Sequence, residues 1–321
     1  MKKELSKVCH FLMVPFTGLG LYNGFRGNRW LKNRIQIFEQ FVIPSLLTQT
    51  SKNFIIWIAW RYEEKSNKIV QDFQKRLNLI KELKFVYTFS GCPFYDDKYP
   101  DDIAKERLLT ALHGSMGELL NVMGECDEVL MTIQPSDDCY RKDFVEGMQN
   151  VLKDDKLQAA GFSRGYICNY FTKEVRENNP KTNPPFVTIK FPREVFIDPL
   201  KHFEYTAIKE DVGKYKKGTA CPSHEFYPNV FGDKYGIINK RGFLVGTHSD
   251  NISTTYKHPY AGEIVSPETL KDFGLFEVEP LKIKYSIRKR LLKALPYKVQ
   301  RKLRYWWGEF FWNKIYEFLR G

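Results

Sequence analysis

Apolar residues recur along the first 150 residues in two different periods. Four short apolar runs, at residues 7–16, 53–60, 84–89 and 127–134, have the length and composition of buried strands. Three longer segments between them, residues 29–46, 70–83 and 104–123, indicate helices. In the first of these, one apolar face is formed by Leu31, Ile35, Phe38 and Val42. Pro44 is expected to end or kink this helix.

The order of these segments predicts the fold class. Strands that alternate with helices favour an α/β fold, here a Rossmann-type sandwich whose mostly parallel central sheet carries helices on both faces. The chain has 321 residues, of which 43% are hydrophobic and 15% aromatic, so a sizeable core is available. In open sheets of this kind, ligands collect outside the carboxyl ends of the strands.

Two adjacent acids, Asp137 and Asp138, follow the fourth predicted strand and should therefore lie at that edge of the sheet. Neighbouring carboxylates repel each other, and they persist when water, a cation or a basic partner neutralises them. Here they could hold Mg²⁺ or Mn²⁺, which in turn binds a diphosphate. A structural role is at least as well supported by these residues alone, because Ser136, Asp137 and Asp138 could form a turn and cap a helix over residues 140–152.

The positive charge of the chain is concentrated near its C-terminal end. The chain has 50 basic and 38 acidic residues, and residues 281–321 contain 12 of the basic and 2 of the acidic ones. The first 280 residues therefore hold 38 basic and 36 acidic residues and are nearly neutral. We therefore expect a globular domain over residues 1–280 and a basic helical extension over residues 281–321. No recognised nucleic-acid-binding motif is present, so nucleic acid is not an expected partner.

The basic extension has the composition of a membrane-surface helix. After Pro296, one stripe of apolar residues is flanked by Lys and Arg and contains Val299, Leu303, Trp307 and Phe310. Such a helix lies in a membrane interface and is attracted by anionic lipid. A helix docked on the globular domain or on a second subunit would bury the same aromatic residues, and this alternative stays open.

Cysteine usage and hydropathy suggest a compartment. The six cysteines are scattered without a CxxC pair, which suits a reduced environment and argues against a structural zinc site. No apolar run approaches the roughly 20 residues of a membrane span. We expect a cytoplasmic protein that is peripheral at the inner face of the cell membrane.

A series of short motifs is spread over the chain. It comprises "TIQPSDD" (residues 132–138), "NPPFVTI" (183–189), "PSHEF" with His224, "GFLVGTHSDNIS" with His248 and Asn251, and an early group of Trp30, Leu31, Arg34, Phe38, Pro44-Ser45-Leu46, Gln49-Thr50, Asn53-Phe54 and Trp57. Together these motifs, over roughly residues 8–255, resemble the rhamnosyltransferase family, which belongs to the GT-A class of nucleotide-sugar glycosyltransferases. The chain departs from the family pattern at Pro135 and Ile133, where an Asp and an Arg are usual.

The resemblance implies a GT-A-like fold and an inverting, metal-assisted transfer. A sugar, rhamnose or another deoxyhexose, would pass from a nucleotide-sugar donor to a surface-polysaccharide or lipid-linked glycan acceptor. A Mn²⁺ or Mg²⁺ ion held by Asp137, Asp138 and His248 would neutralise the departing diphosphate. Glu225 is the first candidate for the base that deprotonates the acceptor hydroxyl and Asp250 the second, although a solvated surface role for Glu225 is about equally supported.

The donor nucleotide is expected to contact two further parts of the chain. Pro15 and Thr17 belong to a glycine-rich segment after the first strand, where GT-A enzymes usually cradle the base and ribose; an ordinary connection would look the same. Ser136, Asp137 and Asn251 complete the predicted donor site. The acid missing at Pro135 keeps a second class open, a non-catalytic glycan- or membrane-binding protein on the same scaffold.

Overall fold

The computed structural model describes residues 7–18, 27–91, 101–213, 216–219, 224–248 and 261–283, without the side chains of residues 101–104. The chain divides into two compact units, Met1–Leu281 and Lys282–Gly321. Only the first two residues of the second unit are among those described, so the predicted helices after Pro296 lie outside them. Among the described helices, none is both long and apolar enough to cross a membrane.

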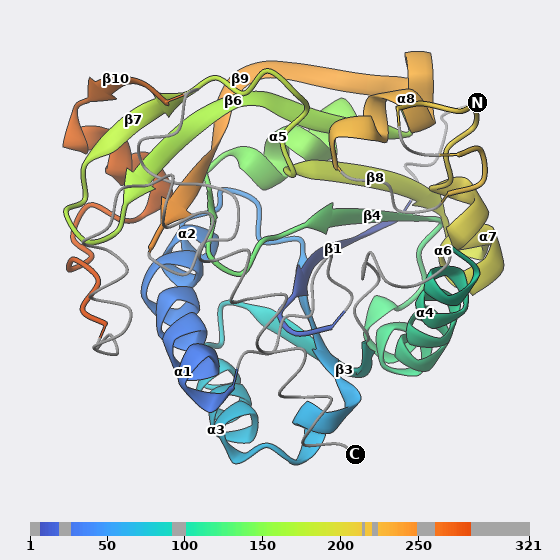
Figure 1. Cartoon of the computed structure of the whole chain (residues 1–321), viewed down its shortest axis with the longest axis horizontal. Coiled ribbons are helices and arrows are strands. Elements are labelled where there is room, and N and C mark those ends of the chain that lie inside the picture. The colour runs from blue at the N-terminus through green and yellow to red at the C-terminus, as the bar shows by residue number, and fades with distance from the viewer. Residues whose placement is uncertain are drawn as a thin grey trace. The chain divides into compact units, whose positions relative to one another are not determined.

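The first unit is built on one ten-stranded sheet (Figure 1). The strands are β1 (Val8–Pro15), β2 (Ile55–Arg61), β3 (Lys84–Gly91), β4 (Glu128–Ile133), β5 (Cys139–Tyr140), β6 (Ala159–Asn169), β7 (Val175–Asn178), β8 (Val187–Pro192), β9 (Tyr235–Thr247) and β10 (Ala261–Val265). The helices are α1 (Asn28–Ile37), the π-helical turn η1 (Phe38–Val42), α2 (Ile43–Leu47), α3 (Lys68–Leu77), α4 (Asp101–Met123), α5 (Phe144–Val151), α6 (Arg193–Phe196), α7 (Pro199–Tyr205) and α8 (Tyr227–Phe231). Short 3-10 turns are η2 (Tyr62–Ser66), η3 (His224–Phe226), η4 (Gly232–Lys234) and η5 (Pro267–Phe273).

The strand order confirms the predicted α/β class. Strands β3, β2, β1 and β4 are neighbours in that order and run parallel. Beyond β4 the sheet is mainly antiparallel, with β8 antiparallel to both β4 and β6, although β9 is parallel to β6. The curled, mixed sheet is consistent with a GT-A-like Rossmann sandwich. The chain runs from β1 outward to β3 and then returns to β4 on the other side of β1, which makes the gap between β1 and β4 a topological switch point.

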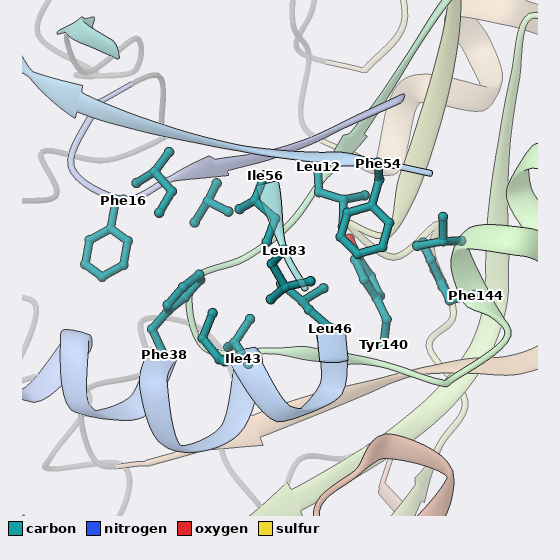
Figure 2. Packing of buried hydrophobic residues seen from close by; sticks show 14 of the residues in the cluster. Leu12, Phe16, Phe38, Ile43, Leu46, Phe54, Ile56, Leu83, Tyr140 and Phe144 are labelled. Carbon is teal, nitrogen blue, oxygen red and sulfur yellow. The ribbon is translucent and has the colours of Figure 1, made fainter. Parts of the chain in front are cut away.

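Two hydrophobic cores cover the two faces of the sheet. Alternate residues of β1 divide between them, Phe11 and Met13 entering one core and Leu12 and Val14 the other. Helix α4 packs into the first core, and helices α1, α3 and α5 pack into the second. Figure 2 shows the second core, where side chains of η1 and α2 point toward the strands. The predicted helices on both faces are therefore present.

The first long helix contains Pro44 and is not ended by it. The helical chain passes through η1 and α2 to Leu47, so of the two outcomes expected at Pro44, an end or a kink, the end is not found. Pro44 falls in the first turn of α2, directly after the π-helical turn, and a missing N–H is tolerated at such a position. The helix predicted over residues 140–152 begins later, at Phe144, because Tyr140 and its neighbour pair with β9.

A buried hydrogen-bonded chain crosses the middle of the sheet. His10 is 1% exposed, and its Nε2 lies 2.7 Å from the hydroxyl of Thr132, which in turn lies 2.5 Å from the hydroxyl of Thr188. The side-chain amide of Gln149 donates to His10 Nδ1 at 3.2 Å, so Nε2 carries the proton that is donated to Thr132. Burial lowers the pKa of His10 to about 3.

The lowered pKa of His10 predicts a pH-dependent stability. Between pH 7.5 and 5.5, His10 becomes protonated in the unfolded chain but stays neutral in the folded chain. The free energy of unfolding should therefore fall by about 1 kcal/mol as the pH is lowered over this range. The variant His10→Gln should lose this part of the pH dependence, and His113→Gln, at an exposed position of α4, should keep it. Urea unfolding at both pH values measures the difference. An unchanged pH dependence in His10→Gln would contradict the neutral, buried state.

Candidate functional site

Asp137 and Asp138 lie in a tight loop at the switch point, formed by residues 134–138 and called the acid loop below. The loop follows β4, and its first residue, Gln134, donates its backbone N–H to the carbonyl of Met13 in β1 at 2.8 Å. The side-chain amide of Gln134 donates to the carbonyls of Pro135 and Asp138 at 2.7 and 2.9 Å. Ser136 is half-buried within this turn. The predicted turn is thus formed, but it does not cap α5, because β5 lies between them.

Asp137 is neutralised by two basic side chains from distant parts of the sequence. Its Oδ2 lies 2.5 Å from Nη1 of Arg34 and 2.8 Å from Nε2 of His248. Arg34 comes from the buried face of α1, and His248 directly follows β9. Their side chains are 7% and 0% exposed, and that of Asp137 is 16% exposed. Burial alone would raise the pKa of Asp137, but Arg34 and His248 outweigh burial and hold it well below its usual range.

Asp138 has a different environment from its neighbour. It is 7% exposed, and its Oδ1 accepts the backbone N–H of Gly246 at 2.9 Å. Burial raises the pKa of Asp138 well above the usual value, and the adjacent charge of Asp137 adds to the rise. The two acids are therefore accommodated differently: Asp137 is ion-paired, and Asp138 accepts a backbone hydrogen bond in an environment that raises its pKa.

A tyrosine and a glycine hold the loop in place. The hydroxyl of Tyr170 donates to the carbonyl of Asp137 at 2.9 Å, and the Tyr170 ring stacks on Phe41 with 3.8 Å between centroids. A Cβ at Gly246 would lie 2.2 Å from the Tyr170 ring and 2.4 Å from the carbonyl oxygen of Asp137. Only glycine therefore lets the end of β9 approach the loop closely enough to bond Asp138.

The arrangement of these residues does not fit a divalent cation. A cation site needs carboxylate oxygens left open toward the ion, at roughly 2.0–2.6 Å. Here Oδ2 of Asp137 already faces a guanidinium and an imidazole, and Oδ1 of Asp138 accepts a backbone N–H. Within the part of the chain that the structure describes, no group of three or more His, Cys, Asp or Glu side chains is arranged to hold a metal. The predicted ligands Asp137, Asp138 and His248 are thus brought together, but as a protein-neutralised cluster.

The predicted donor-site residues after β1 are tied to the neighbouring strands. Pro15 ends β1, and Thr17 is 3% exposed, with its hydroxyl accepting the backbone N–H of Arg61 at 3.2 Å. A Cβ at Gly18 would lie 2.7 Å from the Cα of Gly91, so the segment after β1 meets the end of β3 backbone to backbone. These contacts shape the edge of the sheet, and nucleotide contact by Pro15 and Thr17 stays a prediction.

One candidate base lies in η3, and the other lies outside the described residues. Glu225 is exposed in η3, where its Oε1 accepts the hydroxyl of Thr182 at 3.4 Å. Its neighbour His224 bonds the carbonyl of Asn183 at 2.6 Å, so two of the motif segments meet here. Asp250 and Asn251 are not among the described residues.

The most important contact of the site, between Arg34 and Asp137, is not among the contacts that the sequence predicts. In the sequence Arg34 is one member of a motif, and neither Tyr170 nor Gly246 is a predicted site residue. One signal for Arg34 was available. It follows Leu31 by three residues and precedes Phe38 by four, so it interrupts the apolar face of the helix with a charge that must find a partner. Which acid it meets depends on the tertiary fold.

Comparisons with known proteins leave the family open. No family model and no curated protein matches the chain. Among solved structures, the chain is similar to S. aureus TarS residues 1–349, with 14% identity and a TM-score of 0.36 over 75% of this chain and 60% of that one. For the same fragment in complex with UDP-GlcNAc, the identity is 9% and the TM-score 0.37, over 75% of this chain and 59% of that one. For mouse xyloside xylosyltransferase 1, the identity is 10% and the TM-score 0.32, over 72% of this chain and 85% of that one. The chain thus spans about 60% of the TarS fragment, and at these scores the likeness assigns neither fold nor function.

The buried ion pair predicts a large effect of removing one partner. Arg34→Met should lower the free energy of unfolding by roughly 3–5 kcal/mol, because it leaves the charge of Asp137 buried without its guanidinium. Lys32→Met, at an exposed position of the same helix, should change stability by less than about 0.5 kcal/mol. Chemical unfolding monitored by circular dichroism measures both. A loss below about 1 kcal/mol in Arg34→Met would show that the pair is not formed in solution.

Proposed function

We propose that the chain is a nucleotide-sugar-dependent glycosyltransferase. The observation that carries this proposal is the position of Asp137, Arg34 and His248 at the carboxyl ends of β1 and β4, the switch point where open α/β sheets bind ligands. The motifs that resemble the rhamnosyltransferase family support a deoxyhexose such as rhamnose as the sugar. They also support a surface polysaccharide or a lipid-linked glycan as the acceptor.

The charges of the cluster suit the chemistry of sugar transfer. Breaking the bond between the anomeric carbon and the diphosphate puts negative charge on the leaving oxygen and positive charge on the sugar ring. A guanidinium and an imidazole fixed at this edge can stabilise the leaving group, and their contacts with Asp137 hold them in position before the substrate arrives. No step here needs a metal ion.

The acceptor hydroxyl must give its proton to a general base, and a carboxylate can serve as one. Glu225 and Asp250 remain the two candidates. Glu225 contacts Thr182 and has no described contact with the acid loop, whereas Asp250 follows His248 by only two residues. We therefore favour Asp250 as the base.

Turnover of nucleotide sugars tests the proposed function. The full chain, incubated with UDP-, GDP- and dTDP-activated sugars, should release the nucleoside diphosphate from one class of donor. His248→Gln should lower kcat/KM by about tenfold or more, because the variant loses a group beside the leaving diphosphate. His113→Gln, exposed on α4, should match the parent chain. Failure of every donor to bind would contradict the proposal.

Pro135 favours a second candidate function. The rhamnosyltransferase family, which the chain resembles, usually has an Asp at the position of Pro135. The side chain of proline cannot bind a cation or a ribose hydroxyl. A non-catalytic glycan- or membrane-binding protein on the same scaffold would need neither contact. Binding of a glycan without any turnover would support this function.

We further propose that residues 282–321 attach the protein to the inner face of the membrane. Leu281 must stay in any truncated chain, because it is 3% exposed and its N–H donates to the carbonyl of Tyr170 at 2.7 Å. A chain ending at Ile283 should no longer sediment with anionic liposomes, and the full chain should sediment less as salt is raised. Equal sedimentation of both chains would show that the extension is not the anchor.

A further inference from the structure

The position expected to hold a cation is occupied by a cation of the protein itself. Nη1 of Arg34 lies 2.5 Å from Oδ2 of Asp137, and the guanidinium is placed over the ring of Trp30, with 5.5 Å from its central carbon to the ring centroid. The aromatic ring and the carboxylate together fix the plane of the guanidinium. A divalent ion on Asp137 would have to lie beside this positive charge, and the two would repel each other.

The guanidinium has unused capacity to bind an anion. Arg34 is 6% exposed, and its Nε is buried without a hydrogen-bond partner among the residues described. A guanidinium carries five N–H donors in a planar fork that matches the oxygens of a phosphate group. A buried donor without a partner costs free energy, and a bound oxyanion would remove that cost.

A second unsatisfied group lies in the acid loop, at Gln134. Gln134 is fully buried, and while its amide nitrogen bonds the carbonyls of Pro135 and Asp138, its Oε1 has no hydrogen-bond partner within the described segments. An acceptor left open in this way calls for a donor such as a hydroxyl group. The donor on Arg34 and the acceptor on Gln134 are both buried and without a hydrogen-bond partner among the described residues, and an oxyanion and a hydroxyl group, both present in a nucleotide sugar, are the groups that could satisfy them.

We propose that this chain binds the diphosphate of its donor without a divalent cation, through the guanidinium of Arg34. The proposal rests on the proposed function for the identity of the ligand, a nucleoside diphosphate sugar. Arg34 takes the place that a metal would have, while Asp137 and His248 orient it. The carboxylate of Asp137 is then a positioning group for the anion-binding arginine rather than a metal ligand.

Calorimetric titration of the full chain tests the proposal. UDP, GDP and dTDP are titrated in excess EDTA and in millimolar Mn²⁺, and the dissociation constant of the nucleotide that binds should agree between the buffers within about twofold. Binding that is more than about tenfold tighter with Mn²⁺ would overturn this inference and leave the proposed function standing. Absence of binding in both buffers would overturn the proposed function and this inference with it.

Two variants separate the roles of the two charges. Asp137→Asn would abolish nucleotide binding if the carboxylate held a metal. Our proposal expects affinity in EDTA to be kept within about tenfold, because the asparagine oxygen can still accept a hydrogen bond from the guanidinium of Arg34 and so position it. A loss of nucleotide affinity of more than about tenfold in Asp137→Asn overturns the proposal.

Arg34→Lys keeps the positive charge but loses the planar fork of N–H donors, so we expect nucleotide affinity to fall by about tenfold or more. Lys32→Gln, on the same helix, is the matched control and should bind nucleotide as the parent chain does. Thermal unfolding of each variant verifies that it is folded.

As an independent readout, the electron paramagnetic resonance signal of free Mn²⁺ is recorded as the full chain is added without nucleotide. The signal should persist, because Oδ2 of Asp137 already faces Arg34 and His248 and Oδ1 of Asp138 accepts a backbone N–H. Stoichiometric loss of the signal that Asp137→Asn restores would contradict the proposal whether or not a nucleotide binds.

Discussion

The ion pair between Arg34 and Asp137 is the interaction on which the site depends. A carboxylate beside a second carboxylate, both mostly removed from water, would be strongly unfavourable without a positive partner. The guanidinium supplies that charge at 2.5 Å, and the imidazole of His248 adds a second contact at 2.8 Å. Burial raises the pKa of Asp138, and the charge of Asp137 adds to that rise, so the environment of the second acid favours its neutral form.

The same pair joins elements that are distant in sequence. Arg34 belongs to α1, Asp137 to the loop after β4, and His248 to the end of β9. Tyr170, at the end of β6, bonds both the backbone of Asp137 and, through its own carbonyl, the N–H of Leu281. Both halves of the sheet therefore meet at the acid loop. A substitution of any of these residues should change the position of the side chains around Asp137.

The parallel half of the fold was predictable from sequence because its signals are local. Continuous apolar runs and helical spacing identified β1 to β4 and α1, α3 and α4, and the order of elements placed Asp137 and Asp138 at the carboxyl edge. The antiparallel half and the partners of the acids were not predictable. They depend on long-range pairing, such as that of Cys139 with Leu244, for which no short-range pattern exists. The predicted metal site shows this limit, since two carboxylates in sequence do not reveal that an arginine one hundred residues earlier neutralises one of them.

The central claim is that the Arg34–Asp137–His248 cluster marks where the diphosphate of a nucleotide binds. A crystal structure of the full chain soaked with the nucleoside diphosphate and Mn²⁺ tests it most directly. We expect the diphosphate to lie at the carboxyl ends of β1 and β4, with its oxygens within hydrogen-bond distance of the guanidinium of Arg34. A nucleotide bound elsewhere, or held there by Mn²⁺ on Asp137 with Arg34 displaced, would contradict the account.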